Sequence, residues 1–305
     1  MQQYIARRIL QGILVIFIVT LIIFLLVHLG GDPVRLLLPE EAPEEAKEAL
    51  RIRLGLDQPL HYRYFLFLQG LMQGDLGDSF RYNEPAVRLV MERLPITATL
   101  AILAMVLSTL IAIPLGILAA IKRNSFVDLF ASSGAVIGRA MPNFWLGIML
   151  ILFFAVYLGV LPVSGFDSPK HLILPVVTLG TGMAATVTRL VRSTLLEVIG
   201  LDYIRTARAK GLSNRVVLFK HALRNTMIPV ITIIGLQVPS LVTGAVITES
   251  VFAIPGVGRL TVAAVSSLDM AVVQAAVLLV SIAVVLVNIG IDIIYTIIDP
   301  RVRYD

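Results

Sequence analysis

The sequence contains no cysteine, which excludes disulfide frameworks, thiolate metal sites and a cysteine nucleophile. Charged residues are scarce: they make up 15% of the 305 residues, whereas hydrophobic residues make up 57%. A soluble domain averages about 25% charged residues, so this composition requires an apolar solvent and indicates an integral membrane protein. Histidine occurs only four times, far apart and without a metal-binding spacing, at His28, His61, His171 and His221.

Sequence patterns of common catalytic sites are missing as well. No GxxxxGK[ST] phosphate-binding loop occurs, and we find neither a GxSx nucleophile with a histidine base nor a pair of intramembrane aspartates. These absences argue against an ATPase and against an intramembrane enzyme. A self-sufficient channel or secondary carrier stays open as an alternative, although no convincing internal repeat supports it and Asp292 alone is thin support.

Six stretches reach or approach the roughly 20 apolar residues that a helix needs to cross the hydrocarbon. They do not alternate between polar and apolar residues as barrel strands would. We therefore predict an all-α polytopic membrane protein of about six transmembrane helices, whose first span is retained as an anchor and not cleaved as a signal peptide. The expected spans cover residues 9–29, 96–121, 142–161, 172–191, 227–247 and 270–298.

The distribution of lysine and arginine predicts the orientation of the spans, because cytoplasmic loops carry an excess of both. Basic residues occur at the N-terminus, after the second span, at the C-terminus and most densely between residues 189 and 224. We therefore expect both termini and this dense segment in the cytoplasm. The sequence pI of about 9.6 reflects the same rule, and we expect no nucleic-acid partner.

A soluble-looking segment, DYIRTARAKGLSNRVVLFKHALRNTMIP, interrupts the apolar runs at residues 202–229. Asp202 is placed to cap a short helix that ends at Gly211 in the left-handed conformation, and Ser213 is placed to cap a second helix. DNA binding is disfavoured, because membrane spans tether the segment at both ends. Insertion into lipid headgroups is also disfavoured, because Ala207 and Ala209 offer little apolar area. Small residues beside basic ones suit docking into a protein groove.

The segment resembles the EAA region of permease subunits of binding-protein-dependent ABC importers, and more narrowly the dipeptide/oligopeptide/nickel permease family. The resemblance runs along nearly the whole chain, through YIARRIL, GGDPVR, LGLDQPL, GDLGDSF, RLPITATL, AIPLGILAAIKRNSFVD, LPVSGF, ILPVVTLG, ITESVFAIPGVGRL and IDPRVRY, in the order that the family shows. Arg205, Thr206 and Ala207 stand where the general EAA pattern has Glu, Ala and Ala, and Arg224 stands where it has Pro. These departures match the peptide/nickel branch, so a specific glutamate salt bridge is not carried over, whereas the docking role is.

The resemblance implies a helix that couples this chain to a cytoplasmic ATPase. It implies a second homologous permease subunit, two ATP-binding-cassette ATPase subunits that bind ATP and Mg²⁺, and an extracytoplasmic solute-binding protein, with no cofactor in this chain. The implied location is the cytoplasmic (inner) membrane of a prokaryote. The implied regions are a tail and first helix at 1–29, an extracytoplasmic segment at 30–95, and a permease core of five helices at 96–305 with a coupling region at 192–226. The coupling residues are Asp202, Tyr203, Arg205, Thr206, Ala207, Arg208, Ala209, Lys210 and Gly211.

Polar residues inside the spans are candidates for lining a transport path, because they are expensive there and usually face the bundle interior. Gln237 is the strongest single candidate, since a buried amide is less easily satisfied by its own helix than a hydroxyl. Arg139 either reaches the cytoplasmic interface or faces a polar path. The predicted path residues are Arg139, Thr181, Gln237, Ser240, Gln274 and Asn288, with Thr178, Thr186, Thr243 and Ser281 as further candidates.

Prolines and glycines mark the remaining expected features. Pro142, Pro175, Pro229 and Pro239 are expected to kink their helices. The stretch TESVFAIPGVGRL after the fifth span is expected to form a turn in an outer re-entrant or interfacial element. The lining has no ring of fixed charge, which fits a permease that receives its cargo from a binding protein. The sequence leaves the cargo open among dipeptides, oligopeptides, glutathione-like peptides and nickel.

Overall fold

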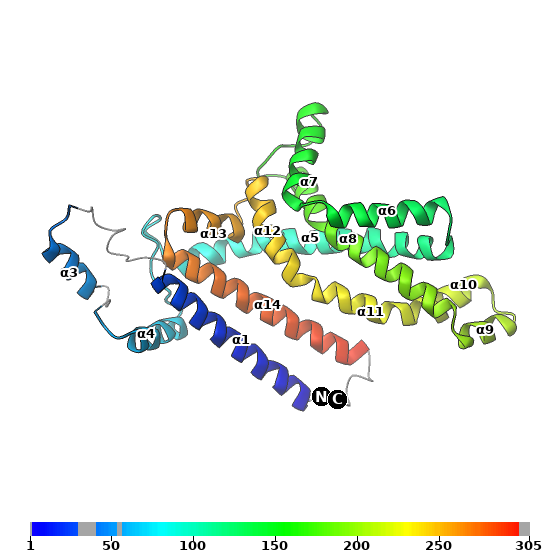
Figure 1. The fold of residues 1–305 in the computed structure, drawn as a ribbon, viewed down its shortest axis with the longest axis horizontal. Coiled ribbons are helices and arrows are strands. Elements are labelled where there is room, and N and C mark those ends of the chain that lie inside the picture. The colour runs from blue at the N-terminus through cyan, green and yellow to red at the C-terminus, as the bar shows by residue number, and fades with distance from the viewer. Residues whose placement is uncertain (1, 30–40, 54–56, 299–305) are drawn as a thin grey trace. The chain divides into compact units, whose positions relative to one another are not determined.

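The computed structural model describes residues 2–29, 41–53 and 57–298, and the elements within these ranges are helices (Figure 1). The all-α prediction is confirmed. Within these ranges, five helices are long and apolar enough to cross a membrane, and a bent pair of helices makes a sixth span if it is counted as one. The five cover Ala6–Val27, Ala86–Ile121, Pro169–Ile199, Asn214–Leu236 and Met270–Ile293.

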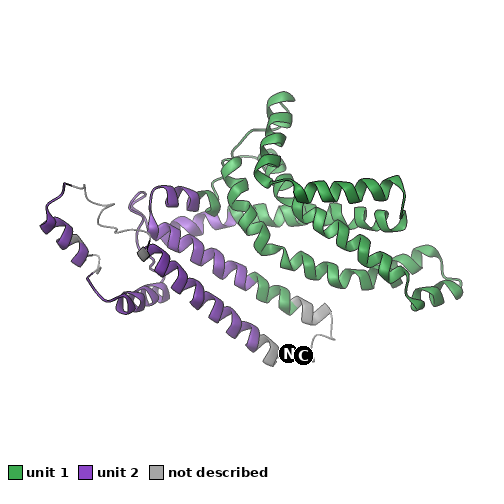
Figure 2. Cartoon of the chain, viewed as in Figure 1, with its two compact units in different colours: residues 1, 96–259, 287–305 green, residues 2–95, 260–286 purple. Residues whose placement is uncertain are grey.

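The chain divides into two compact units, each built from segments that are distant in sequence (Figure 2). Unit 2 comprises residues 2–95 and 260–286, and unit 1 comprises residues 96–259 and 287–305 together with residue 1. The helices before the core are α1 (Gln2–Leu29), α3 (Glu44–Arg53) and α4 (Leu60–Gln73). The later helices are α5 (Ala86–Ile121), α6 (Phe126–Ala140), α7 (Asn143–Leu150), α8 (Pro169–Ile199), α9 (Asp202–Ala209), α10 (Asn214–Val216), α11 (Leu223–Leu236), α12 (Val238–Val251), α13 (Val257–Ser266) and α14 (Met270–Ile298).

The third expected span, residues 142–161, is wrong in its extent. The helical region begins with α6, and α7 follows it at an angle of 107° and continues as a π-helix over Ile151–Tyr157. The bend has a local cause: Met141 is extended, because a residue before proline is pushed out of the helical region, and Pro142 then precedes the first residue of α7. Polar residues interrupt the apolar ones in SFVDLFASSG at the start of α6, and they concealed this helix from a search for apolar runs.

The fifth expected span is also divided. Residues 227–247 do not form one helix, because α11 ends at Leu236 and α12 begins at Val238, with Gln237 between them. Pro239 lies in the first turn of α12, where the missing N–H of proline costs no helical hydrogen bond. Pro175 and Pro229, in contrast, lie inside α8 and α11.

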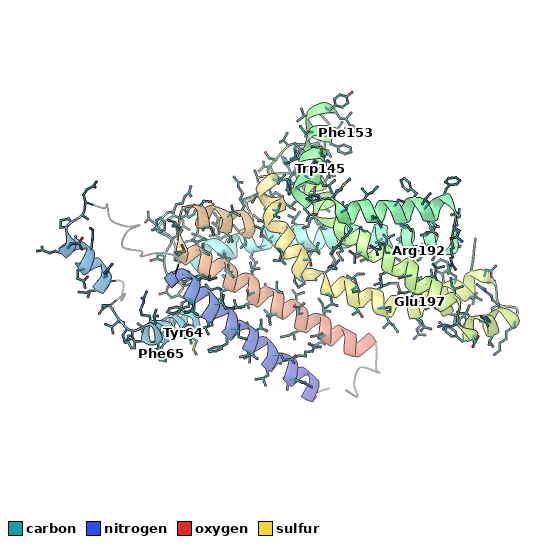
Figure 3. All side chains as sticks on the ribbon, viewed as in Figure 1. Tyr64, Phe65, Trp145, Phe153, Arg192 and Glu197 are labelled. Carbon is teal, nitrogen blue, oxygen red and sulfur yellow. The ribbon has the colours of Figure 1, made fainter. Side chains whose placement is uncertain are left out.

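In unit 2, α4 packs against α1 through aromatic side chains. The ring of Phe24 lies 5.1 Å from that of Tyr64 and 5.9 Å from that of Phe67, measured between centroids. The hydroxyl groups of Thr20 and Tyr64 lie 2.9 Å apart, and Thr20 is buried (Figure 3 labels Tyr64). The apolar character of the sequence around α4 therefore serves to cover one face of the first span.

A second link in the same unit joins the segment after α4 to the turn before α14. The buried Ser79 hydroxyl donates to the buried carboxylate of Asp269 at 2.5 Å, and the backbone N–H of Tyr82 donates to the Ser79 hydroxyl at 3.0 Å. Asp269 also accepts a hydrogen bond from the Val272 backbone N–H in the first turn of α14. A buried polar pair of this kind ties residues that are 190 positions apart in the sequence.

The core of the other unit is built around α8. Buried apolar side chains of α8, including Leu179, Val187 and Val191, form one cluster with Leu100 of α5 and Phe252 after α12. α6 and α11 pack along α8, and α9 and α10 follow at its C-terminal end (Figure 1). α8 thus connects the packed centre of the unit to the predicted coupling segment.

Candidate functional site

The predicted coupling helix is α9, Asp202–Ala209. Leu201 occupies the N-cap position without a side-chain cap, so the prediction that Asp202 caps the helix is wrong: Asp202 is the first helical residue. Its carboxylate is instead paired with Arg205 at 3.2 Å, on the exposed surface. An acidic residue in the first turn still favours the helix, because it complements the partial positive charge of the N-terminus.

Gly211 adopts the predicted left-handed conformation, with φ at 78°. Its N–H donates to the Arg208 carbonyl at 2.9 Å, which satisfies one of the free carbonyl groups at the end of α9. Ser213 then occupies the N-cap position of α10, as predicted, although its side chain makes no capping hydrogen bond. The second helix continues from α10 through a π-helix at Val217–Ala222 into α11.

α9 has an inner face that packs on its own chain. Ile204 and Ala207 are buried at 0% and 7% exposure. They belong to a cluster with the last turns of α8, and this cluster contains Ala120, Leu195, Val198, Ile204, Ala207, Val217 and Ala222. The side chain of Ala207 therefore packs within this chain.

The outer face of α9 carries the other predicted coupling residues. Among them, Arg208 and Lys210 make no ion pair with any residue that the structure describes. Tyr203 is held from the side, because its hydroxyl accepts a hydrogen bond from the Asn225 amide at 2.7 Å. The exposed set, which we call the α9 outer face, is Asp202, Tyr203, Arg205, Thr206, Arg208, Ala209, Lys210 and Gly211.

A cavity of about 680 Å³ lies between α6, α8 and α11, and we call it the arginine cavity. Three guanidinium groups line it: Arg139 comes from the last turn of α6, and Arg189 and Arg192 come from α8 (Figure 3 labels Arg192). The lining contains no aspartate or glutamate. Its remaining members are Ser132, Val136, Ala185, Thr186, Leu190, Ser193 and Ile233.

One of the three arginines, Arg192, is neutralised by an acidic residue that is not part of the cavity lining. Arg192 forms a two-pronged ion pair with the buried Asp128 of α6, with Nε to Oδ1 at 2.5 Å and Nη2 to Oδ2 at 2.8 Å. Asp128 also accepts hydrogen bonds from the Asn124 backbone N–H at 2.9 Å and the Ser132 hydroxyl at 3.2 Å. This pair therefore links the turn between α5 and α6 to α8.

The predicted path residues lie on several helices, and each is described by its own surroundings. Arg139 lines the arginine cavity, together with Thr186 from the further candidates. Thr181 lines a separate, mostly apolar cavity of about 260 Å³ between α5, α6 and α8, and its hydroxyl donates to the Val177 carbonyl. Gln237 is half-buried at the break between α11 and α12. Ser240 is exposed on α12, and Gln274 and Asn288 are half-buried on α14.

The structure adds a residue that the sequence analysis missed. Glu249 is completely buried near the end of α12, and its carboxyl group accepts hydrogen bonds from the Thr97 hydroxyl at 2.6 Å and the Arg259 backbone N–H at 3.0 Å. The Thr97 hydroxyl in turn accepts from the Val257 N–H at 2.9 Å. We call this group the Glu249 clamp. A glutamate inside an apolar run, seven residues before a glycine pair, was the available signal.

The glycines of the PGVG turn are explained by the clamp. A Cβ atom added to Gly256 would overlap the Glu249 carboxyl group, and one added to Gly258 would lie 2.5 Å from the Val246 Cα. The turn expected in TESVFAIPGVGRL is present, with α12 ending at Val251 and α13 beginning at Val257. The backbone thus closes around a buried carboxyl group.

Comparison with known protein families gives two matches that together cover nearly the whole chain. Residues 112–304 match the family described as binding-protein-dependent transport system inner membrane component. Residues 1–101 match the N-terminal family of the membrane component of binding-protein-dependent transport systems.

Similar full-length proteins are found among characterised sequences. The glutathione transport system permease protein GsiC of Escherichia coli O6:H1 is 43% identical over 305 residues, which is 100% of both chains. The proteins of the same name in E. coli K12 and in Shigella dysenteriae serotype 1 are 42% identical over the same length.

Two solved structures share the fold. A chain of the methionine ABC transporter MetNI in inward-facing conformations aligns with a TM-score of 0.58 at 22% identity, covering 69% of this chain and 96% of that chain. A chain of an amino acid ABC transporter with histidines aligns with a TM-score of 0.50 at 16% identity, covering 70% and 94%. At these identities the likeness supports the fold alone.

Proposed function

Because this chain belongs to the family of inner membrane components of binding-protein-dependent transport systems, we propose that it is the permease subunit that moves glutathione or a related short peptide into the cell. The observation that carries the cargo assignment is the 43% identity to a glutathione permease over the full length of both chains. The chain is thus a multi-pass inner membrane protein whose relatives are transporter subunits.

The proposed assembly contains a second permease subunit, two ATPase subunits that bind ATP and Mg²⁺, and an extracytoplasmic binding protein. No phosphate-binding loop occurs in this sequence, which supports the placement of ATP hydrolysis on separate chains. We place both termini in the cytoplasm, together with the basic segment that contains α9.

The α9 outer face is the proposed docking surface for an ATPase subunit. ATP binding can shift the permease only if it changes contacts that differ between the two states of the transporter. Since Ile204 and Ala207 anchor α9 to the last turns of α8, a displacement of α9 reaches a membrane span directly. The exposed basic side chains Arg208 and Lys210 are the charges available to an acidic partner surface.

Deletion of the gene should reduce binding-protein-dependent uptake of labelled glutathione to the background rate, and expression of the gene should restore it. The measurement is initial uptake in the deletion strain, compared across glutathione, labelled di-, tri- and pentapeptides, and Ni(II). Selective loss of peptide or Ni(II) uptake with normal glutathione uptake would contradict the proposed cargo while leaving the permease role in place.

Reversal of charge on the α9 outer face should abolish coupled uptake without preventing membrane insertion. We expect Arg208→Glu with Lys210→Glu to lower glutathione uptake at least about tenfold and to weaken co-purification of the ATPase, because like charges across an interface cost several kcal/mol. Lys122→Glu, an exposed change in the α5–α6 turn, is the matched control.

Ala207→Trp should give a different result, because a large side chain does not fit into the buried cluster around Ala207. We expect that variant to unfold or aggregate when extracted in detergent. Normal ATPase binding and uptake by the α9 charge-reversal variant would refute the docking surface.

A further inference from the structure

The arginine cavity holds more positive charge than the protein itself neutralises. Arg192 is paired with Asp128, but neither Arg139 nor Arg189 has an acidic partner among the residues that the structure describes. The remaining polar lining consists of the hydroxyl groups of Ser132, Thr186 and Ser193, which are uncharged. The cavity is therefore an anion-attracting space of about 680 Å³.

The location of these charges makes them unusual. Arg189 lies on α8, which is one of the helices long and apolar enough to span the membrane, and Arg139 lies on α6 of the bent pair. Both side chains line the arginine cavity and are exposed in this chain, and ionisable side chains on spanning helices often mark a solute path. Arg139 has a partial structural role, because it lies in the last turn of α6 and complements the negative end of that helix. Arg189 lies ten residues before the end of α8, too far from the last turn to complement that helix end, and it begins the basic segment that we expect on the cytoplasmic side.

We propose that Arg139 and Arg189 form a binding site for the carboxylate groups of the transported solute. Guanidinium groups bind carboxylates through two parallel hydrogen bonds, which provides orientation as well as charge. Glutathione carries two carboxylates and one ammonium group at neutral pH, so two guanidinium groups without partners match it in number. This assignment rests on the proposed function, since it names the part of the cargo that the permease recognises.

The role of Asp128 follows from the same arrangement. By neutralising Arg192, Asp128 limits the free positive charge of the cavity to two groups. A transport path has to bind its solute weakly enough to release it. If Arg192 were also free, three guanidinium groups would hold the two carboxylates of the solute more tightly. The ion pair therefore adjusts the strength of the site as well as the packing of α6 on α8.

Because the chain has no native cysteine, a single introduced thiol can report the electrostatic potential in the cavity. Ser193→Cys places one thiol in the cavity, at an exposed position with a nearly isosteric change. In the complete complex in nanodiscs, we would measure the rates at which this thiol on the chain reacts with an anionic sulfonatoethyl and a cationic trimethylammonioethyl methanethiosulfonate. The anionic reagent should be favoured, and the ratio of the two rates should fall at least about tenfold when Arg139→Gln and Arg189→Gln are combined.

Arg123→Gln is the matched control, because it removes one exposed arginine outside the cavity and should leave the rate ratio unchanged. Protection of the thiol by S-methylglutathione, but not by the same tripeptide with both carboxylates amidated, should be lost in the double variant. An unchanged rate ratio in the double variant would overturn the site, whatever solute the complex transports.

Uptake into proteoliposomes provides the second arm. Arg139→Gln and Arg189→Gln should each lower uptake of glutathione at least about tenfold, while uptake of its glycine-amide analogue should fall less. Discrimination by the binding protein cancels, because each variant is compared with the unmodified chain for the same solute. Arg139→Lys and Arg189→Lys, which keep the charge, should retain part of the uptake.

The outcomes separate the two proposals. If the unmodified complex imports neither form of glutathione, the proposed cargo is wrong, and the thiol rates still decide whether the site binds anions. If both forms lose uptake equally, and the loss appears only in vesicles that contain phosphatidylglycerol and not in pure phosphatidylcholine, the arginines hold a lipid phosphate and the carboxylate site is refuted. An equal loss in both kinds of vesicle indicates a structural role and also refutes it.

Discussion

Replacement of Glu249 with alanine should destabilise the chain by about 3–5 kcal/mol, because the change leaves buried hydrogen-bond donors without an acceptor and creates a cavity. The donors are the Thr97 hydroxyl and the Arg259 backbone N–H, and Glu249 is buried at 0% exposure. Thermal unfolding of the purified chain in detergent, followed by size-exclusion chromatography, measures the effect.

Two further variants isolate the cause. Glu197→Ala removes an exposed carboxylate from α8 and should change stability by no more than about 0.5 kcal/mol (Figure 3 labels Glu197). Thr97→Val removes one partner of the clamp and should cost less than Glu249→Ala, since the carboxyl group retains the Arg259 N–H. Equal stability of Glu249→Ala and Glu197→Ala would show that the clamp contributes nothing.

Gly256→Ala tests the same clamp from the other side. The added Cβ overlaps the Glu249 carboxyl group, so the change should be strongly destabilising in the unmodified chain. In the Glu249→Ala background that space is free, and the same substitution should cost much less. Additive effects would contradict the geometry, because independent sites add and touching sites do not.

Asp128→Ala should destabilise the packing of α6 on α8 by about 3 kcal/mol, the lower end of the range for breaking a buried ion pair. The Asp128 side chain is 6% exposed and that of Arg192 is 28% exposed, so the loss leaves a partly buried guanidinium without its partner. The measurement is again the unfolding midpoint in detergent, with each single variant and the charge-exchanged pair Asp128→Arg with Arg192→Asp.

The charge-exchanged pair should recover part of the loss, and the interaction energy between the two positions should exceed 1 kcal/mol. The exposed Arg88–Glu92 pair of α5 is the control, and its removal should change stability by less than about 0.5 kcal/mol. No recovery in the exchanged pair, together with a full loss of stability in Asp128→Ala, would show that the ion pair contributes nothing and that Asp128 acts through the turn at Asn124.

Much of the fold follows from the hydrophobic pattern, because a membrane span has to be apolar over a fixed length. The pattern failed where a helix did not need to be apolar throughout. The first turns of α6 carry Asp128 and Ser132, which are partnered inside the protein, so this helix was not recognised from its composition. The break at Gln237 was hidden for the opposite reason, since apolar residues continue on both sides of it.

The candidate site was predictable only in its local part. The position of α9 and the conformation of Gly211 depend on capping and turn preferences that act over a few residues. The inward orientation of Ala207 depends on α8 and the π-helix at Val217–Ala222, and the arginine cavity depends on α6 meeting α8, whose Asp128 and Arg192 are 64 residues apart. Contacts between positions so far apart leave no periodicity in one sequence, which is why Arg189, Asp128 and Glu249 were missed.

The link between Ser79 and Asp269 has a consequence for the order in which the protein is made. The two residues belong to one compact unit, but residues 96–259 of the other unit are synthesised between its two segments. At about 5–20 residues per second, this interval lasts roughly 8–33 s. During that time Asp269 has not been synthesised and Ser79 lacks its buried acceptor. The unit that contains both residues can therefore complete its packing only after the ribosome has made nearly the whole chain.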